Sequence, residues 1–106
     1  MKNKMEIGVA VTTCSSKGAA SRIVNDLLRE DLIACGHVEG PIESMYRWKG
    51  NLEKETEWRI SMKYDLVKEA ELKEAVQEMH PYETPQWVTW KAETSEKYYG
   101  WVMNPN

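Results

Sequence analysis

Three side chains with soft donor atoms stand where a fold can bring them together. Cys14 follows an alternating apolar segment, and Met79 and His80 end a helical pattern before Pro81. A thiol, a thioether and an imidazole nitrogen suit Cu(I), so we take His80, Cys14 and Met79 as candidate metal ligands. The alternative is structural. His80 then ends the helix and bonds a free carbonyl, and Cys14 is a small residue on the solvent side of a loop.

A second pair of candidate donors lies two residues apart on a predicted strand. Cys35 and His37 therefore share one face of that strand and could chelate a metal. The residue types favour structural roles, with Cys35 as a small buried side chain and His37 as a hydrogen-bonded one.

Acidic residues alternate along another extended segment. Glu53, Glu55 and Glu57 are spaced by two. Alternating charges on an edge strand usually prevent pairing with other chains, and we expect that role here rather than an acidic site.

Catalytic arrangements are missing from the sequence. It has no recognisable Ser, His and Asp triad, no glycine-rich phosphate loop and no paired acidic motif. Residues 15–18 could hold an anion at a helix start, although a helix cap explains them equally well. We expect a protein that is not an enzyme.

Hydrophobic periodicity predicts the elements that carry these residues. Alternation predicts strands, and apolar residues three and four apart predict helices. The expected strands cover 6–13, 32–38, 42–48, 58–64 and 86–90. The helices end near residues 30 and 80, and a short last helix ends near 102. Ser15 or Ser16, Asp65, and Thr94 or Ser95 are the expected N-caps.

This order predicts an α+β fold, a ferredoxin-like βαββαβ sandwich with both helices on one face of an antiparallel sheet and a short C-terminal helix. If Trp58, Ile60, Met62 and Tyr64 point away from the helices, they form an apolar surface that favours an oligomer. RNA-recognition motifs and acylphosphatases share this order. The third strand lacks the basic-aromatic stretch of the former, and the loop after the first strand has Lys17 where the latter need Arg.

Composition sets the class of protein. The 106 residues, 12.3 kDa, suit a single domain over 1–106, and 42% apolar with 29% charged residues is typical of globular chains. A net charge of −3 does not favour binding to nucleic acid or anionic membranes. Lys2 and Lys4 precede Glu6 and only a short apolar stretch, which does not resemble a secretory signal. With two cysteines, this favours reduced thiols and a cytoplasmic protein.

Four segments resemble one family, the CutA divalent-cation tolerance proteins. Residues 44–52 (SMYRWKGNL), followed by Glu57, resemble its S-x-Y-x-W-x-G-x-[IL] signature, and residues 80–85 (HPYETP) resemble its H-P-Y-x-x-P segment. Residues 33–35 (IAC) are similar to its A-A-C stretch, and 98–101 (YYGW) to its C-terminal helix. The resemblance implies a ferredoxin-like protomer, a homotrimer with inward-facing sheets, and similarity to PII signalling proteins. It also implies a role in tolerance of copper and other divalent metals, with copper or another divalent metal as the ion that the protein would bind.

The chain departs from the family pattern at two places linked to metal binding. The family's cysteine near the end of the first strand falls on Thr12 here rather than on Cys14, and its His pair becomes Met79 and His80.

The matched segments also contain amphipathic aromatic residues, which are typical of subunit packing. The PII similarity implies an alternative, a cleft between subunits that stacks a small ligand, with Lys49 and Arg47 supplying cations for an anionic one. The candidate residues for this ligand cleft or trimer interface are Tyr46, Trp48, Lys49, Glu57, Tyr82 and Trp101.

Overall fold

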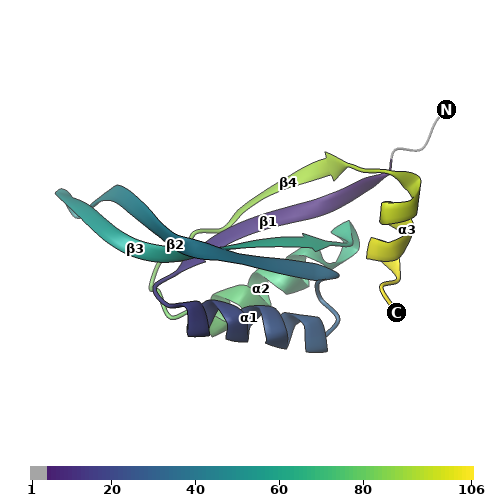
Figure 1. The fold of residues 1–106 in the computed structure, drawn as a ribbon, viewed down its shortest axis with the longest axis horizontal. Helices are drawn as coiled ribbons and strands as arrows, with labels where there is room; N and C mark the ends of the chain where they lie inside the picture. Colours follow the sequence, from purple (N-terminus) through teal and green to yellow (C-terminus); the bar gives the residue numbers. More distant parts are fainter. Residues whose placement is uncertain (1–4) are drawn as a thin grey trace.

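An antiparallel sheet covered on one side by two helices forms the body of the protein (Figure 1). The structure is a computed structural model that describes residues 5–106, so residues 1–4 of the expected domain, with Lys2 and Lys4, lie outside the described residues. The elements are β1 (Glu6–Cys14), α1 (Lys17–Arg29), β2 (Cys35–Trp48), β3 (Asn51–Tyr64), a 3-10 turn (Leu66–Lys68), α2 (Glu69–Met79), β4 (Val88–Glu93) and α3 (Glu96–Met103). The strand order β2-β3-β1-β4 confirms the predicted ferredoxin-like α+β fold.

The helices begin and end where side chains satisfy their free backbone groups. Ser16, rather than Ser15, caps α1 by accepting a hydrogen bond from the Ala19 N–H at 3.0 Å. Ser95 caps α3 in the same way, whereas Asp65 caps the 3-10 turn that leads into α2. α2 ends at His80, whose backbone is extended because Pro81 disfavours a helical residue before it.

The structure shows which face of β3 is buried, a question that the alternating sequence leaves open. Ile60, Met62 and Tyr64 are fully buried and pack in the same core cluster as apolar residues of α1 and α2. They therefore face the helices, and an exposed apolar surface made of these residues is ruled out. The Tyr64 ring lies against Gly8 on β1, where an added Cβ would come within 2.3 Å of it.

The second strand is one continuous element rather than the two expected segments. Its pairing with β3 shifts between Glu39 and Ile42, so Gly40 and Pro41 form an irregularity within β2. β2 is an edge strand, and an edge tolerates a proline, which has no N–H to donate to the ladder. Pairing resumes at Ile42 opposite Glu57, and the Trp58 ring packs on Gly40, where a Cβ would come within 2.4 Å of the ring.

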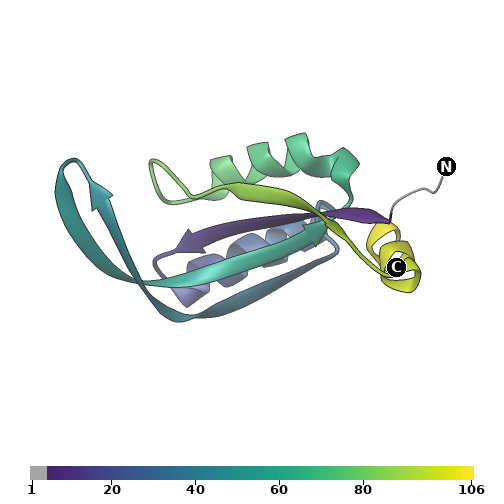
Figure 2. The ribbon, with the colours of Figure 1, turned by 90° about the horizontal axis from the view of Figure 1, so that it is seen from above.

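Beyond the body, β2 and β3 continue as a two-stranded hairpin, residues 42–57, which we call the arm. The ladder between β1 and β3 ends at the pair Cys14 and Trp58, so β3 residues before Trp58 pair only with β2. Lys49 and Gly50 form the tip, both with positive φ (49° and 82°), as a two-residue hairpin turn requires. Figures 1 and 2 show the arm projecting from one end of the sheet and α3 lying at the other.

α3 packs its Val102 side chain against Ile7 and Ala34 in a small second core. Within residues 5–106, no helix has the length and apolar character needed to cross a membrane.

Candidate functional site

The end of β1 and the end of α2 meet at Cys14 and His80. The Cys14 Sγ atom lies 3.7 Å from His80 Nε2, although the two residues are 66 positions apart in the chain. Both are buried, with 0% and 8% of their surfaces exposed. β4 pairs with β1 from Glu6 to Val11. The segment that joins α2 to β4 therefore runs beside the end of β1, which brings His80 to Cys14.

Hydrogen bonds fix the protonation of the His80 ring. The backbone N–H of Tyr82 donates to His80 Nδ1 at 3.1 Å, so this nitrogen carries a lone pair. The proton of the neutral ring is then on Nε2, which donates to the Thr13 carbonyl oxygen at 2.8 Å. His80 ends α2 as expected, but the carbonyl that its ring bonds belongs to Thr13 of β1 rather than to the free end of the helix.

Burial keeps both groups of this pair neutral. It lowers the pKa of His80, against weaker opposing effects of the Thr13 carbonyl and the Glu57 charge. Burial, aided by the Glu57 charge, raises the pKa of the Cys14 thiol to about 11. Cys14 is therefore not the solvent-side loop residue of the structural alternative, because it is enclosed in the core.

The Cys14 and His80 side chains are not free to bind a metal ion in their present state. Both nitrogens of His80 are engaged, and the Cys14 thiol is protonated at neutral pH. Within residues 5–106, no three His, Cys, Asp or Glu side chains converge to hold a metal ion. In this arrangement the residues do not fit a metal, and coordination would require His80 to release Thr13 or Tyr82.

No hydrogen bond among residues 5–106 joins the other candidate donors to this pair. Met79 packs partly buried against the main core. Cys35 is partly buried, and its Sγ lies 3.5 Å from the Tyr98 hydroxyl, a contact that the sequence did not suggest. His37 is exposed on β2. Thr12, at the position of the family's cysteine, is buried, and its Oγ1 has no hydrogen-bond partner among the described residues.

Next to this pair, Tyr82 and Glu57 form a hydrogen bond. The Tyr82 hydroxyl donates to Glu57 Oε2 at 2.7 Å, and the Tyr82 ring lies 4.9 Å from that of His80. Burial, followed by the hydrogen bond and charge of Glu57, raises the pKa of the Tyr82 hydroxyl. Glu57 is only 6% exposed, so it does not present its charge to solvent as a residue that prevents pairing with other chains would.

A groove of about 770 Å³ opens between the arm and the 82–86 segment. Four of the six cleft candidates line it, namely Tyr46, Trp48, Glu57 and Tyr82. Cross-strand pairing explains why, since Ile42, Ser44 and Tyr46 on β2 stand opposite Glu57, Glu55 and Glu53 on β3.

Two of the cleft candidates do not line the groove. Lys49 is in the tip turn, with its Nζ 5.8 Å from the centre of the Trp48 ring. Trp101 lies on α3 beside Tyr98, at the end of the sheet away from the arm (Figure 1). Arg47 is also absent from the lining, because alternate strand residues point to opposite faces. The cations expected for an anionic ligand are therefore missing from the groove wall.

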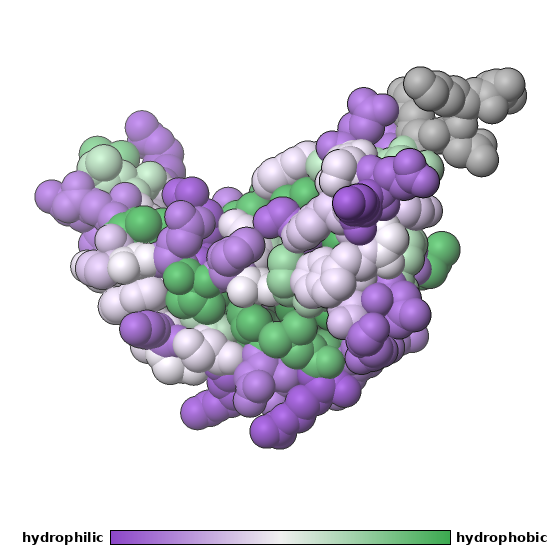
Figure 3. All heavy atoms as spheres, turned by 45° about the vertical axis from the view of Figure 1, so that its right-hand side comes forward, coloured by the Kyte–Doolittle hydropathy of each residue, from purple (hydrophilic) through white to green (hydrophobic). Residues whose placement is uncertain are grey.

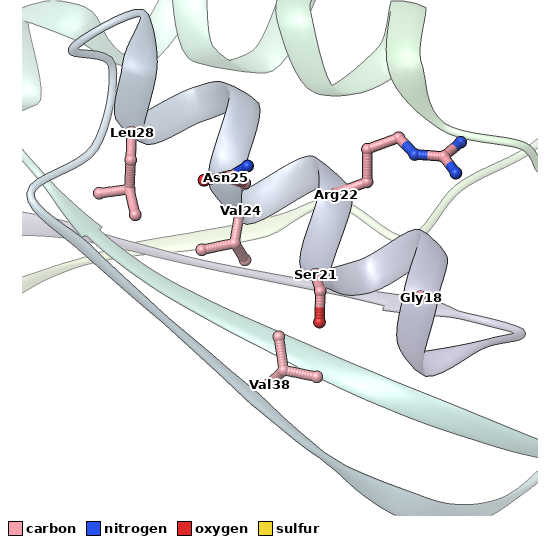
Figure 4. Close-up of a pocket in the computed structure, with 7 residues that line it drawn as sticks. All are labelled: Gly18, Ser21, Arg22, Val24, Asn25, Leu28 and Val38. Carbon is pink, nitrogen blue, oxygen red and sulfur yellow. The ribbon is translucent and has the colours of Figure 1, made fainter.

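A second hollow, of about 590 Å³, lies between α1 and the edge strand β2. Val24, Leu28 and Val38 face it, whereas the Arg22 side chain extends away (Figure 4). This hollow brings together no set of catalytic or metal-binding side chains.

Several large apolar side chains are exposed on the arm and on β4. The most exposed of these are Met45, Leu52, Val88 and Trp90 (71%, 79%, 47% and 48%). On the face that Figure 3 shows, hydrophobic residues also gather over the body of the protein, apart from the projecting arm, with hydrophilic residues around them. Surfaces of this kind are typical of protein contacts.

The fold defines a class, an α+β sandwich with a groove beside a projecting hairpin. A family model described as "CutA1 divalent ion tolerance protein" matches residues 8–105. The chain belongs to this family of divalent-ion tolerance proteins, whose description names tolerance and no reaction.

Individual relatives agree with this assignment. The chain is 37% identical over 92 residues to the divalent-cation tolerance protein CutA of Thermotoga maritima, covering 86% of this chain and 90% of that protein. It is 34% identical over 97 residues to the CutA homolog of Xenopus laevis, covering 91% of this chain and 64% of that longer protein. The crystal structure of CutA1 from Ehrlichia chaffeensis superposes with a TM-score of 0.89 at 32% identity, covering 98% and 95% of the two chains.

Proposed function

We propose that this protein contributes to divalent-cation tolerance as a non-catalytic homotrimer that binds a small ligand in the groove beside the arm. The observation that carries the proposal is the groove itself, because it gathers aromatic and charged side chains from β2, β3 and the 82–86 segment. A concave site with aromatic walls and a few polar groups is the usual form of a small-molecule site.

The uncovered face of the sheet supports the trimer. Val9 and Val11 pair with Trp90 and Val88 on β4, on the side opposite the core residue Ala10. Trp90 and Val88 are about half exposed there, although they are large and apolar. Packing this face against another copy would remove that surface from water.

Charged substitutions on this face test the trimer. Val88→Lys and Trp90→Glu should each dissociate the assembly in light scattering coupled to size-exclusion chromatography. Val67→Lys is the control, because Val67 is 85% exposed in the 3-10 turn outside this face. A protein that is monomeric without any substitution, or trimers that survive both changes, would contradict the proposed interface.

A second candidate function, binding of a soft metal such as copper without catalysis, requires Cys14 and His80 to leave their present arrangement, in which the thiol is protonated and both ring nitrogens are engaged. A thiol and an imidazole 3.7 Å apart can become ligands if the ring gives up its present hydrogen bonds. Copper and zinc titrations of the reduced protein test this, with Met79 as the candidate third donor. Uptake that survives both His80→Ala and Cys14→Ser would contradict a site at this pair.

We also propose a cytoplasmic location, because both cysteines are free, as they would be in a reducing compartment.

A further inference from the structure

Glu57 is a nearly buried carboxylate without a cation beside it. Its side chain lines the groove, it is 6% exposed, and it forms no salt bridge within residues 5–106. The Tyr82 hydroxyl donates to Oε2, whereas Oε1 accepts no hydrogen bond among the described residues and is not one of their buried unpartnered atoms, so it is open to the groove. This free oxygen could accept a charge-assisted hydrogen bond from a cation in the groove.

Carboxylates outnumber basic side chains in the groove wall. Glu53, Glu55 and Glu83 line it with Glu57, and Arg59 is the only basic residue of its lining. Glu53, Glu55 and Glu57 stand two residues apart on β3, so they form a row with a spacing of roughly 6.6–6.8 Å.

Tyr46 lines the groove together with these three carboxylates. Desolvation raises the pKa of its hydroxyl, followed by a hydrogen bond to Glu55 and then by the charges of Glu55, Glu57 and Glu53. The wall therefore presents negative charge beside aromatic rings, an arrangement that attracts organic cations.

A single metal ion does not match this row, because no three carboxylates within residues 5–106 converge on one point. A chain of amines separated by methylene groups does match it, since each amine can meet one carboxylate while the methylenes pack on Tyr46 and Trp48. We propose that the groove binds a linear organic cation with two or more amino groups, of the diamine or polyamine class. The inference rests on the proposed function, whose ligand it names by chemical class.

Isothermal titration of the full chain with spermidine tests this. The variant Glu53→Gln/Glu55→Gln should weaken binding about tenfold or more, because it removes two charge-assisted contacts. The control Glu71→Gln/Glu74→Gln makes the same change of net charge on exposed positions of α2 and should bind as the unchanged protein does. Glu57→Gln, which keeps an acceptor for Tyr82, should also weaken binding.

Three outcomes would overturn the inference. These are absence of spermidine binding, equal loss in the control, and zinc binding that depends on Glu53 and Glu55 and excludes spermidine. The oligomeric state is measured on the same samples. A trimer that does not bind spermidine would overturn the proposal of an amine ligand but not the proposed trimer. A monomer that binds spermidine through these glutamates would contradict the proposed trimer but not the amine ligand.

Discussion

His80 donates from Nε2 to the carbonyl oxygen of Thr13 at 2.8 Å, which joins the end of α2 to the end of β1. The same ring accepts the Tyr82 N–H and thereby orients the segment that walls the groove. His80 is thus primarily a positioning residue in this arrangement.

Replacing His80 with Ala should destabilise the protein by about 1–3 kcal/mol, because the buried Tyr82 N–H and Thr13 carbonyl lose their partner. Urea unfolding followed by tryptophan fluorescence measures this. His37→Ala is the control, since His37 is exposed, and should change stability by less than about 0.5 kcal/mol. Equal effects of the two changes would contradict the role given to His80.

The lowered pKa of His80 predicts a pH dependence of stability. The unfolded chain takes up the proton near pH 6.5, and the folded protein only at lower pH. This contribution to stability is therefore complete above pH 6.5 and is lost as the pH falls below it toward the folded pKa. The free energy of unfolding should fall more steeply between pH 7 and 5.5 in the unchanged protein than in His80→Gln. Parallel curves would contradict the burial of a neutral ring.

Tyr82→Phe should lower the free energy of unfolding, measured in urea, by about 1–3 kcal/mol, because it leaves the nearly buried Glu57 carboxylate without its donor. Combining it with Glu57→Gln in a double-mutant cycle should reveal coupling between the two side chains. Tyr99→Phe is the control, since the Tyr99 side chain has no hydrogen bond within residues 5–106. Additive effects in the cycle would mean that the bond contributes nothing.

Cys14 should react slowly with alkylating reagents. Its pKa of about 11, compared with 9.0 for an ordinary cysteine thiol, reduces the thiolate fraction about 100-fold at neutral pH. Burial further limits access of the reagent to the sulfur. Iodoacetamide labelling followed by peptide mass spectrometry should modify Cys35 first. Unfolding in urea should remove the difference, whereas fast native labelling of Cys14 would contradict its burial.

The sequence predicts the fold well because hydrophobic periodicity and caps act locally. Alternation over 58–64 predicts the strand but not its buried face, since both faces of a strand satisfy the same period. The face depends on which side the helices cover, and here the Tyr64 ring fits only over Gly8. Similarly, Gly40 and Pro41 suggest a break in the sequence, whereas the structure continues β2 through them. The pairing with β3 on both sides and the Trp58 ring against Gly40 are long-range contacts that the local sequence does not reveal.

The candidate site is predictable in part for a related reason. The order of the elements places Cys14 near His80, but the tautomer of His80 depends on Thr13 and Tyr82, which no spacing identifies as partners. Strand alternation would have separated Arg47 from Tyr46 and Trp48, and it is the signal that could have shown the groove to be acidic.

Native mass spectrometry of the reduced protein tests the central claim, a homotrimer with a ligand groove, most directly. We predict one assembly of three 12.3-kDa chains that takes up spermidine and loses this uptake in Glu53→Gln/Glu55→Gln. A bare monomer that binds no amine would contradict both the trimer and the groove.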